Sequence, residues 1–316
     1  MQKARTAGIF AALSSAVFLG LSPVFGKLAI NFGFSPLAVV ALRTSMAAAL
    51  IFLVVVIFYR PFLYIFPIGL LGCALAGLIN GLGSILYYMA LTRLSASVGQ
   101  ILYSLYPFFV AIWMVLDRQP PSRLTLIRIS IATVAMFLLI SLPSHPADLI
   151  GVAMMLGASI LYALHLPINQ RVLYEVPAPT VTLYTLLAMS AVVVPAYLLF
   201  DKRWPSLEMP WWPVLGLTLV TSLSRLMLFM GIKHIGGMQT ALLGLGELLV
   251  TILFSYIWLH EQLLWTQWLG AAGLSLSLLL VKFESVTPQP HSIKSGWLAW
   301  IRPPDIPRDI PWGPHE

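Results

Sequence analysis

Residues 36–58 read PLAVVALRTSMAAALIFLVVVIF, an apolar run in which Arg43 is the one charged residue. Such a run has the length of an α-helix that crosses a lipid bilayer, which needs about 20 apolar residues. The whole chain has the same character, because 59% of its 316 residues are hydrophobic and 9% are charged, whereas a soluble domain has about 25% charged residues. The sequence therefore predicts a helical protein that crosses a membrane several times.

Apolar blocks of this kind recur along the chain between turn or charge signals, and they predict ten transmembrane helices. The expected limits are 8–29, 36–58, 65–91, 96–116, 123–142, 149–170, 179–200, 211–232, 237–258 and 265–282. Pro36, Pro179 and Pro213 stand where a predicted helix begins, a position that tolerates proline because its missing N–H would have no partner there. The predicted fold class is an all-α membrane protein.

The 18 Lys and Arg residues indicate how the predicted helices are oriented. With a cytoplasmic N-terminus, the inner ends and tails hold Lys3, Arg5, Arg60, Arg118, Arg123, Arg128, Arg171, Lys233, Lys282, Lys294, Arg302 and Arg308. The outer ends hold Lys27, Arg93, Lys202 and Arg203. This asymmetry follows the positive-inside rule, so we expect both termini in the cytoplasm and a location in the plasma membrane. The basic residues form no soluble patch, so no nucleic-acid partner is expected.

The two halves of the chain resemble each other at a shift of about 141 to 144 residues. Residues 88–94, YMALTRL, align with residues 229–235, FMGIKHI, and Ser35-Pro36 aligns with Ala178-Pro179. Each copy contains five predicted helices, an odd number, so the second copy enters the bilayer from the opposite side. Inverted repeats of this kind give transporters alternating access to a site near the middle of the membrane.

This repeat defines the expected domain organisation. We expect one five-helix repeat in residues 8–142 and a second, inverted copy in residues 149–282. Residues 283–316 are rich in proline and contain no long apolar run, so a disordered cytoplasmic tail is predicted there. Gly77 and Gly81 have the GxxxG spacing that lets another helix approach closely, which we interpret as packing within the monomer.

Several motifs in this order resemble the EamA-like branch of the drug/metabolite transporter superfamily, over roughly residues 8–281. They are residues 20–27 (GLSPVFGK), Arg43, residues 105–111 (LYPFFVA), Glu247 and residues 259–261 (LHE). The Glu-Pro pair that the family often carries is incomplete in both copies, which read Tyr106-Pro107 and Glu247-Leu248. The resemblance implies a secondary transporter that exports a small metabolite, an amino acid or a related compound.

Charged residues deep in predicted helices are the first candidates for a functional site, because burying a charge in hydrocarbon is costly. Arg225 precedes the turn at Gly236 by eleven residues and Glu247 follows it by eleven, so the two reach similar depth. One hypothesis is that they pair in one state and are separated by substrate or a proton in another. The alternative is a static ion pair, or charges that face water and have no role in transport. The expected binding residues are Asn80, Ser84, Tyr103, Tyr106, Tyr162, Arg225 and Glu247, and the candidates for coupling or gating are Glu247, Arg225, Arg43 and His165.

Other chemistry is not indicated by the sequence. No Cys pair, His-x-x-x-His or acidic cluster predicts a metal site, and there is no nucleotide-binding loop, so we expect no cofactor and no enzymatic activity. The expected partners are a small-molecule substrate, the lipid bilayer and a coupling proton, in a monomer or homodimer. Two alternatives stay open: a multidrug or lipophilic-cation exporter of the same fold, in which Glu247 attracts the cation, and a membrane-embedded lipid-modifying enzyme.

Overall fold

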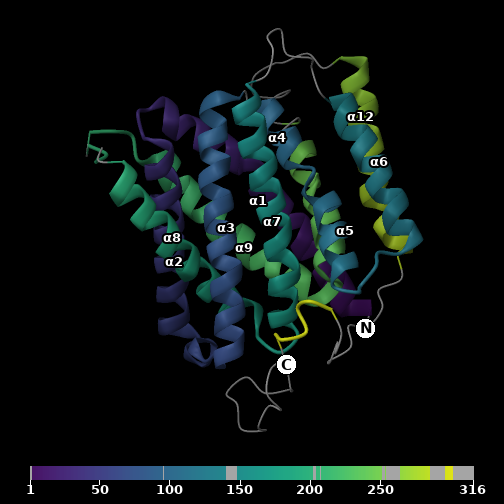
Figure 1. Cartoon of the computed structure of the whole chain (residues 1–316), viewed down its shortest axis with the longest axis horizontal. Coiled ribbons are helices and arrows are strands. Elements are labelled where there is room, and N and C mark those ends of the chain that lie inside the picture. The colour runs from purple at the N-terminus through teal and green to yellow at the C-terminus, as the bar shows by residue number, and fades with distance from the viewer. Residues whose placement is uncertain are drawn as a thin grey trace.

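The described residues fold into a bundle of helices (Figure 1). The structure, a computed structural model, describes residues 2–94, 96–139, 148–201, 204–206, 208–250, 253, 264–284 and 296–301, and these residues contain no β-strand. In the first half the helices are α1 (Gln2–Asn31), α2 (Pro36–Phe58), η1 (Arg60–Leu63), α3 (Pro67–Arg93), α4 (Ala96–Tyr103), α5 (Tyr106–Leu116) and α6 (Arg123–Leu139). In the second half they are α7 (Leu149–Leu173), α8 (Ala178–Phe200), α9 (Trp212–Ile235), α10 (Gly237–Gly244), α12 (Trp265–Leu279) and η2 (Leu280–Phe283).

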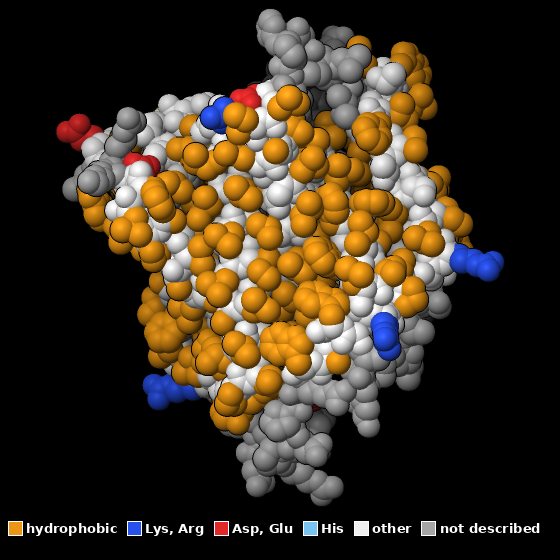
Figure 2. Space-filling view, in the orientation of Figure 1, with side chains coloured by type: hydrophobic (Ala, Val, Ile, Leu, Met, Phe, Trp, Pro, Cys, Tyr) orange, Lys and Arg blue, Asp and Glu red, His pale blue; other side chains and the backbone are white. Residues whose placement is uncertain are grey.

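The apolar helices have the length of membrane spans. Among the described residues, seven stretches are long and apolar enough to cross a bilayer: Lys3–Asn31, Pro36–Phe58, Pro67–Arg93, Gly99–Leu116, Leu149–Leu173, Ala178–Phe200 and Trp212–Ile235. Gly237–Val250 and Trp268–Phe283 are shorter apolar helices. Figure 2 shows hydrophobic side chains covering most of one face of the bundle, with Lys and Arg at its margins. This surface suits contact with lipid, and the prediction of a helical membrane protein is confirmed.

Most of the predicted helix starts are confirmed, and local chemistry explains them. Ser35 caps α2 by accepting a hydrogen bond from the Ala38 N–H at 3.1 Å, with Pro36 in the first turn. Asp148 caps α7 by accepting from the N–H groups of Ile150 and Gly151 at 2.8 and 3.3 Å. These side chains satisfy backbone donors that have no partner within the helix. Of the expected helix residues, 140–142, 251, 252 and 254–258 lie outside the described part of the chain.

One predicted helix, residues 96–116, is interrupted. α4 ends at Tyr103 and α5 begins at Tyr106, with Pro107 in its first turn. The physical reason is that proline lacks the N–H that would continue the helical hydrogen bonds and restricts the residue before it. The second half has a similar break, because α10 ends at Gly244 and the helix resumes at 246–250 after a turn at Leu245. The chain therefore has a helix break in corresponding places of the two halves.

The two halves pack on each other through related pairs of helices. When each helix of one pair is replaced by its counterpart in the other half, the result is another pair that is in contact. α1 packs on α9 and its counterpart α7 packs on α3, while α2 packs on α9 and α8 packs on α3. The corresponding helices α2 and α8 pack on each other, as do α6 and α12, which lie side by side at one edge of the bundle (Figure 1). The two halves therefore contact each other through corresponding helices.

The glycines of the GxxxG spacing permit the contact between α3 and α8. A Cβ atom added to Gly77 would lie 2.6 Å from both the Ala188 Cβ and the Thr185 carbonyl oxygen, and one added to Gly81 would lie 3.1 Å from the Val192 Cβ. These distances leave no room for a side chain at Gly77. The prediction that the motif serves packing within the monomer agrees with these contacts.

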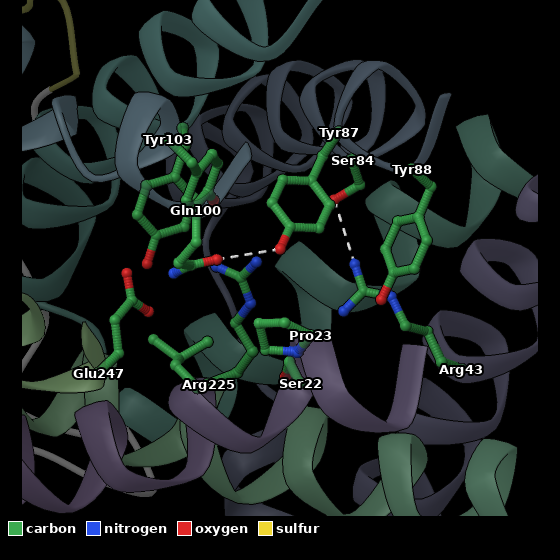
Figure 3. Close-up of a pocket in the computed structure, with 12 residues that line it drawn as sticks. Ser22, Pro23, Arg43, Ser84, Tyr87, Tyr88, Gln100, Tyr103, Arg225 and Glu247 are labelled. Carbon is green, nitrogen blue, oxygen red and sulfur yellow. Dashed lines mark hydrogen bonds between the residues drawn. The ribbon is translucent and has the colours of Figure 1, made fainter. Parts of the chain in front are cut away.

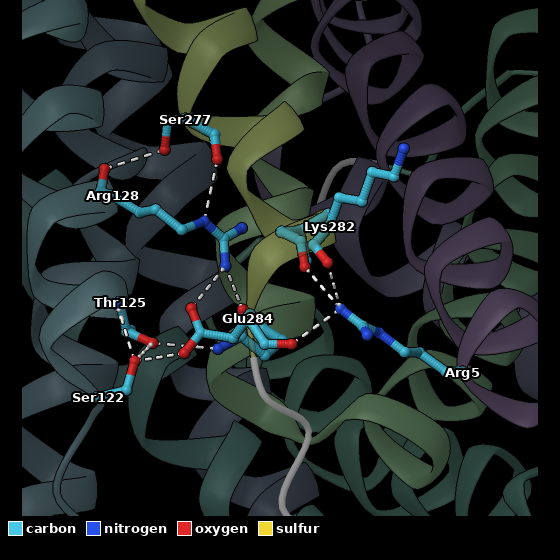
Figure 4. A network of polar contacts seen from close by, with 9 residues as sticks. Arg5, Ser122, Thr125, Arg128, Ser277, Lys282 and Glu284 are labelled. Carbon is cyan, nitrogen blue, oxygen red and sulfur yellow. Dashed lines mark hydrogen bonds and ion pairs between the residues drawn. The ribbon is translucent and has the colours of Figure 1, made fainter. Parts of the chain in front are cut away.

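Polar contacts join distant parts of the chain at one end of the bundle, which we call the Arg5 end. Arg5 of α1 donates to the carbonyl oxygens of Val281, Lys282 and Glu284 at 2.9, 3.1 and 2.8 Å (Figure 4). The start of the first helix therefore lies beside the end of the last one. Arg128, which the sequence analysis counts among the basic residues of the inner ends, is fully buried.

The Arg128 guanidinium forms an ion pair with Glu284 at 3.4 Å and donates to the Ser277 carbonyl oxygen at 3.0 Å (Figure 4). A second buried ion pair at the Arg5 end joins Asp117 and Arg171 at 2.7 Å. The opposite end, which we call the Arg93 end, has the ion pair between Arg93 and Asp148 at 2.8 Å, and both of its side chains are partly exposed. Hydrogen bonds from Arg93 and from the Gly151 amide lower the pKa of Asp148.

Part of the predicted disordered tail is ordered. Residues 296–301 form turns at the Arg5 end, where the N–H of Leu298 donates to Asp117 Oδ1 at 3.1 Å and the side chains of Leu298 and Ile301 are buried. The Trp297 ring lies 6.0 Å from the Trp113 ring, centre to centre. The expectation of a disordered tail is therefore wrong for these residues, because their apolar side chains find a surface on which to pack. Residues 285–295 and 302–316 lie outside the described part of the chain.

Candidate functional site

A cavity of about 50 Å³ lies among the central helices and is lined by residues from both halves (Figure 3). Its lining residues are Leu19, Ser22 and Pro23 of α1, Arg43 of α2, Ser84, Tyr87 and Tyr88 of α3, Gln100 and Tyr103 of α4, Tyr162 of α7, Arg225 of α9, and Glu247. Tyr103 and Glu247 stand next to the two helix breaks described above. The cavity wall thus combines four tyrosines with two arginines and one glutamate.

Arg43 reaches the cavity from α2 and contacts both halves of the bundle. Its Nη1 donates to Thr221 Oγ1 at 3.4 Å and its Nη2 donates to Ser84 Oγ at 3.3 Å. The guanidinium carbon lies 4.9 Å from the centre of the Tyr88 ring, a distance at which a cation is attracted to an aromatic face. The side chain is 8% exposed, so Arg43 does not extend outward to the membrane surface.

Arg225 is held by uncharged groups from the first half and from α7. With the Asn80 amide oxygen turned toward it, Asn80 accepts from Nη1 at 3.1 Å and from Nη2 at 2.9 Å. Nη1 also lies 3.2 Å from His165 Nε2, and the guanidinium carbon lies 5.5 Å from the centre of the Tyr162 ring. Arg225 thus lies in a polar setting at the α3–α7–α9 contact.

These contacts determine which nitrogen of His165 carries the proton. A guanidinium has donors and no acceptor, so Nε2 must accept from Arg225. Nδ1, which faces the carbonyl oxygen of Tyr162, must then be the protonated nitrogen. His165 is therefore neutral in this arrangement.

Arg225 and Glu247 both line the cavity, but they are not paired in this conformation. The ion pairs between described residues are Arg93–Asp148, Arg128–Glu284 and Arg171–Asp117, and none of them joins Arg225 to Glu247. The hypothesis that the two residues reach similar depth agrees with their shared cavity. The hypothesis of a static Arg225–Glu247 ion pair does not, because Arg225 directs its guanidinium toward Asn80 and His165.

Tyrosine rings from three helices form one wall. The Tyr103 ring lies 5.2 Å from Tyr162 and 4.9 Å from Tyr87, centre to centre, and Tyr162 lies 4.9 Å from Tyr106. Tyr87 donates to Gln100 Oε1 at 3.1 Å. Tyr106 stands behind this wall, where its hydroxyl donates to the Ala241 carbonyl oxygen at 3.0 Å and joins α5 to α10.

The structure brings most of the predicted site residues together. Arg43, Ser84, Tyr103, Tyr162, Arg225 and Glu247 line the cavity. Asn80 and His165 stand behind Arg225 and contact it, and Tyr106 supports the aromatic wall. The prediction omitted Tyr87, Tyr88 and Gln100, which also line the cavity; their spacing of three or four residues from Ser84 and Tyr103 along the same helices was the available signal. Within the described residues, no three His, Cys, Asp or Glu side chains form a group that could hold a metal ion.

A bundle of apolar helices with buried charges around a central cavity is an arrangement found in membrane transporters. Comparison with known proteins agrees, because the model of the EamA-like transporter family matches residues 6–141 and matches again over residues 149–283. The chain belongs to the EamA-like transporter family, which is part of the drug/metabolite transporter superfamily.

Solved structures support the fold. One crystal structure superposes with a TM-score of 0.70 over 90% of this chain and 100% of its own, with 14% sequence identity. At this identity the similarity shows a shared fold and carries no information about substrate. No curated protein matches the sequence.

Proposed function

We propose that this protein is a secondary transporter that exports a small organic metabolite, an amino acid or a related compound, across the plasma membrane by alternating access. The observation that carries the proposal is the central cavity, whose charged residues Arg43, Arg225 and Glu247 come from both halves of the chain. Ligand sites between repeats, beside broken helices, are characteristic of secondary transporters. The preference for export and for amino acids rests on the family resemblance.

Ten spans in two inverted five-helix repeats are the topology that we propose. The equivalent helices α1 and α7 support it, since α1 begins at the Arg5 end and α7 begins beside Arg93. The contact of Arg5 with η2 also supports it, because an even number of crossings returns the chain to the side where it began.

We propose that the Arg5 end faces the cytoplasm. Among described residues this end carries Lys3, Arg5, Arg60, Arg118, Arg123, Arg171, Lys233 and Lys282, whereas the opposite end carries Lys27 and Arg93. Basic residues gather on the cytoplasmic side of membrane proteins.

The cavity favours a small solute that carries charge. Pockets that hold drug-sized ligands measure about 300–1,000 Å³, and this cavity measures about 50 Å³. Its wall offers two guanidinium groups, one carboxyl group and several aromatic faces, a combination that suits a zwitterion. Glu247 is the group that we propose carries a coupling proton, because a buried carboxyl group can exchange one between the two sides.

A multidrug or lipophilic-cation exporter is the second candidate function. The position of Glu247 beside the aromatic wall favours it, since a carboxylate and tyrosine faces together attract organic cations. The two arginines and the small volume oppose it. The third candidate, a lipid-modifying enzyme, is opposed by the family assignment, because EamA family members are transporters.

Reconstitution in liposomes tests these candidates. Purified protein would be given labelled amino acids, sugars and organic cations, with and without a pH gradient, and protein-free liposomes serve as the control. We expect accumulation of amino acids that depends on the gradient. Transport restricted to organic cations would favour the multidrug candidate, and lack of transport for every solute would contradict the proposed function.

A further inference from the structure

Two buried guanidinium groups of the cavity wall have partners that carry no charge. Arg43 contacts the hydroxyls of Ser84 and Thr221 and the ring of Tyr88, and Arg225 contacts the Asn80 amide and neutral His165. Both side chains are more than nine-tenths buried. Arg43 Nε is also buried and has no hydrogen-bond partner among the described residues. The two cations are thus oriented by their surroundings but are not neutralised by them.

The two guanidinium groups stand at neighbouring levels of the contact between α3 and α9. Arg43 bridges Ser84 of α3 and Thr221 of α9, and one helical turn away Arg225 of α9 contacts Asn80 of α3. One turn corresponds to a rise of about 5.4 Å. Both guanidinium groups line the same cavity, so both can approach a small anion bound in it (Figure 3).

The repeat shows that each half contributes one arginine to this wall. In the alignment of the two halves, Asn80 corresponds to Thr221 and Ser84 corresponds to Arg225. The Ser84–Thr221 level is therefore the counterpart of the Asn80–Arg225 level. The counterpart of Arg43 is Leu186, and the counterpart of Arg225 is Ser84. Each level therefore has one arginine, supplied by α2 at one level and by α9 at the other.

The charges of the cavity wall do not balance. Glu247 is the acidic residue that lines the cavity with the two arginines, so the described wall has an excess positive charge even when Glu247 is ionised. A charge buried away from water is costly unless an opposite charge compensates it. Guanidinium groups bind carboxylates with particular strength, because their planar N–H groups match the two carboxylate oxygens. A carboxylate on the solute would supply the missing compensation.

We propose that Arg43 and Arg225 form an anion subsite that binds the carboxylate group of the transported solute. The remainder of the solute then extends toward Tyr103, Tyr162 and Glu247, where a positively charged group would be favoured. His165 is a positioning residue in this arrangement, since its neutral ring accepts from Arg225 without adding charge. This inference rests on the proposed transport function and narrows the substrates to solutes that carry a carboxylate.

A binding experiment with three matched probes tests the subsite in detergent-solubilised, full-length protein. The probes are L-leucine, L-leucinamide, which lacks the carboxylate, and 4-methylpentanoate, which lacks the amine. We expect wild-type protein to bind leucine and 4-methylpentanoate, and to bind leucinamide far more weakly. Dissociation constants from calorimetry give the readout, and thermal stability without ligand reports on folding.

Substitution of Arg43 gives the second part of the test. Arg43→Gln should weaken binding of both carboxylate probes about 10- to 100-fold, as expected for the loss of one hydrogen bond between charged groups, and should leave leucinamide binding unchanged. Arg43→Lys should recover part of the loss, because it restores the charge but not the fork of donors. The matched control is Arg60→Gln, which changes an exposed arginine of η1 that donates to the Val56 carbonyl oxygen of the preceding helix, α2.

Several outcomes would overturn the proposal. They are leucinamide binding as tightly as leucine, no binding of either carboxylate probe to wild-type protein, and an equal effect of Arg43→Gln on all three probes. If Arg43→Gln does not fold, the anion subsite is still tested by the Arg43→Lys variant and by comparing leucine with leucinamide binding to wild-type protein. Failure of the transport function looks different: carboxylate-dependent binding would persist in detergent, while liposomes would accumulate none of the probes.

Discussion

Glu247 is the residue with the most specific expected role in transport. Its side chain is 3% exposed and lines the cavity. A carboxyl group in this position can bind a proton when the cavity is open to one side of the membrane and release it when the cavity is open to the other side. Coupling to a proton would then pass through this one side chain.

Glu247→Gln should abolish accumulation driven by a pH gradient while leaving exchange of solute intact. A gradient of one pH unit supplies about 1.4 kcal/mol per proton, enough for about tenfold accumulation, and glutamine cannot carry the proton. Uptake by proteoliposomes with and without the gradient gives the measurement. Glu208→Gln, which changes an exposed glutamate, should behave as wild type. Gradient-dependent uptake that persists in Glu247→Gln would show that Glu247 does not carry the proton.

The buried ion pair at the Arg5 end predicts a stability effect at single residues. Asp117→Asn should lower the stability of the purified protein by about 3–5 kcal/mol, because removing one partner leaves the other charge buried. The side chains of Asp117 and Arg171 are 0% and 3% exposed. A shift of the thermal unfolding midpoint in detergent measures the effect.

Asp148→Asn is the matched control, since it removes an acidic residue from a partly exposed ion pair with Arg93. Exposed ion pairs contribute little to stability, so a much smaller shift of the unfolding midpoint is expected. Because the pKa of Asp148 is lowered in the folded protein, its contribution is present above the ordinary pKa of aspartate and is lost as the pH falls through the lowered value. Equal shifts for the two variants would contradict the assignment of Asp117 to a buried pair.

At the scale of elements, the close approach of α3 and α8 depends on a residue without a side chain. Gly77→Ala should lower stability by about 1–3 kcal/mol, the usual cost of overpacking, because the added Cβ would lie 2.6 Å from the Thr185 carbonyl oxygen on the α8 backbone. A side chain can relieve such a clash by changing its rotamer, but a carbonyl oxygen of a helix backbone cannot. Thermal unfolding of the purified variant checks the prediction.

Gly246→Ala provides the comparison within another helical segment. A Cβ atom there would have Ala16 Cβ at 3.5 Å as its nearest neighbour, an ordinary contact. Alanine also favours helix over glycine by about 1 kcal/mol, so this variant should be as stable as wild type or more so. A Gly77→Ala protein with unchanged stability would show that α3 and α8 do not approach as closely as described.

At the scale of the whole molecule, the topology predicts which residues face each side of the membrane. In a Cys73→Ala background, Arg93→Cys should react with an impermeant maleimide in intact cells, because it lies at the proposed outer end. Arg60→Cys is also exposed but should react only after permeabilisation, because it lies at the proposed cytoplasmic end. The reverse pattern would show the opposite orientation, and labelling of both from outside would show that α3 does not cross the membrane.

The sequence by itself was sufficient for the class of fold, for most helix limits and for most of the site. Membrane helices are readable because a bilayer imposes length and apolarity on each one separately, so residues 36–58 were predicted to the residue. Glu247, Arg225 and Arg43 could be found because a charge deep in an apolar helix is rare.

Tertiary structure alone decided how these side chains pair. It directed Arg225 to Asn80 and His165, gave Arg43 its contacts with Ser84 and Thr221, buried Arg128 against Glu284 and ordered residues 296–301 on Asp117. Two residues at equal depth in the membrane need not face each other, because depth does not determine how each helix is rotated about its own axis. A hydrogen bond between their side chains depends on that rotation as well as on depth. The partners of a buried charge are therefore set by how helices distant in the chain pack, which the periodicity of each helix does not encode.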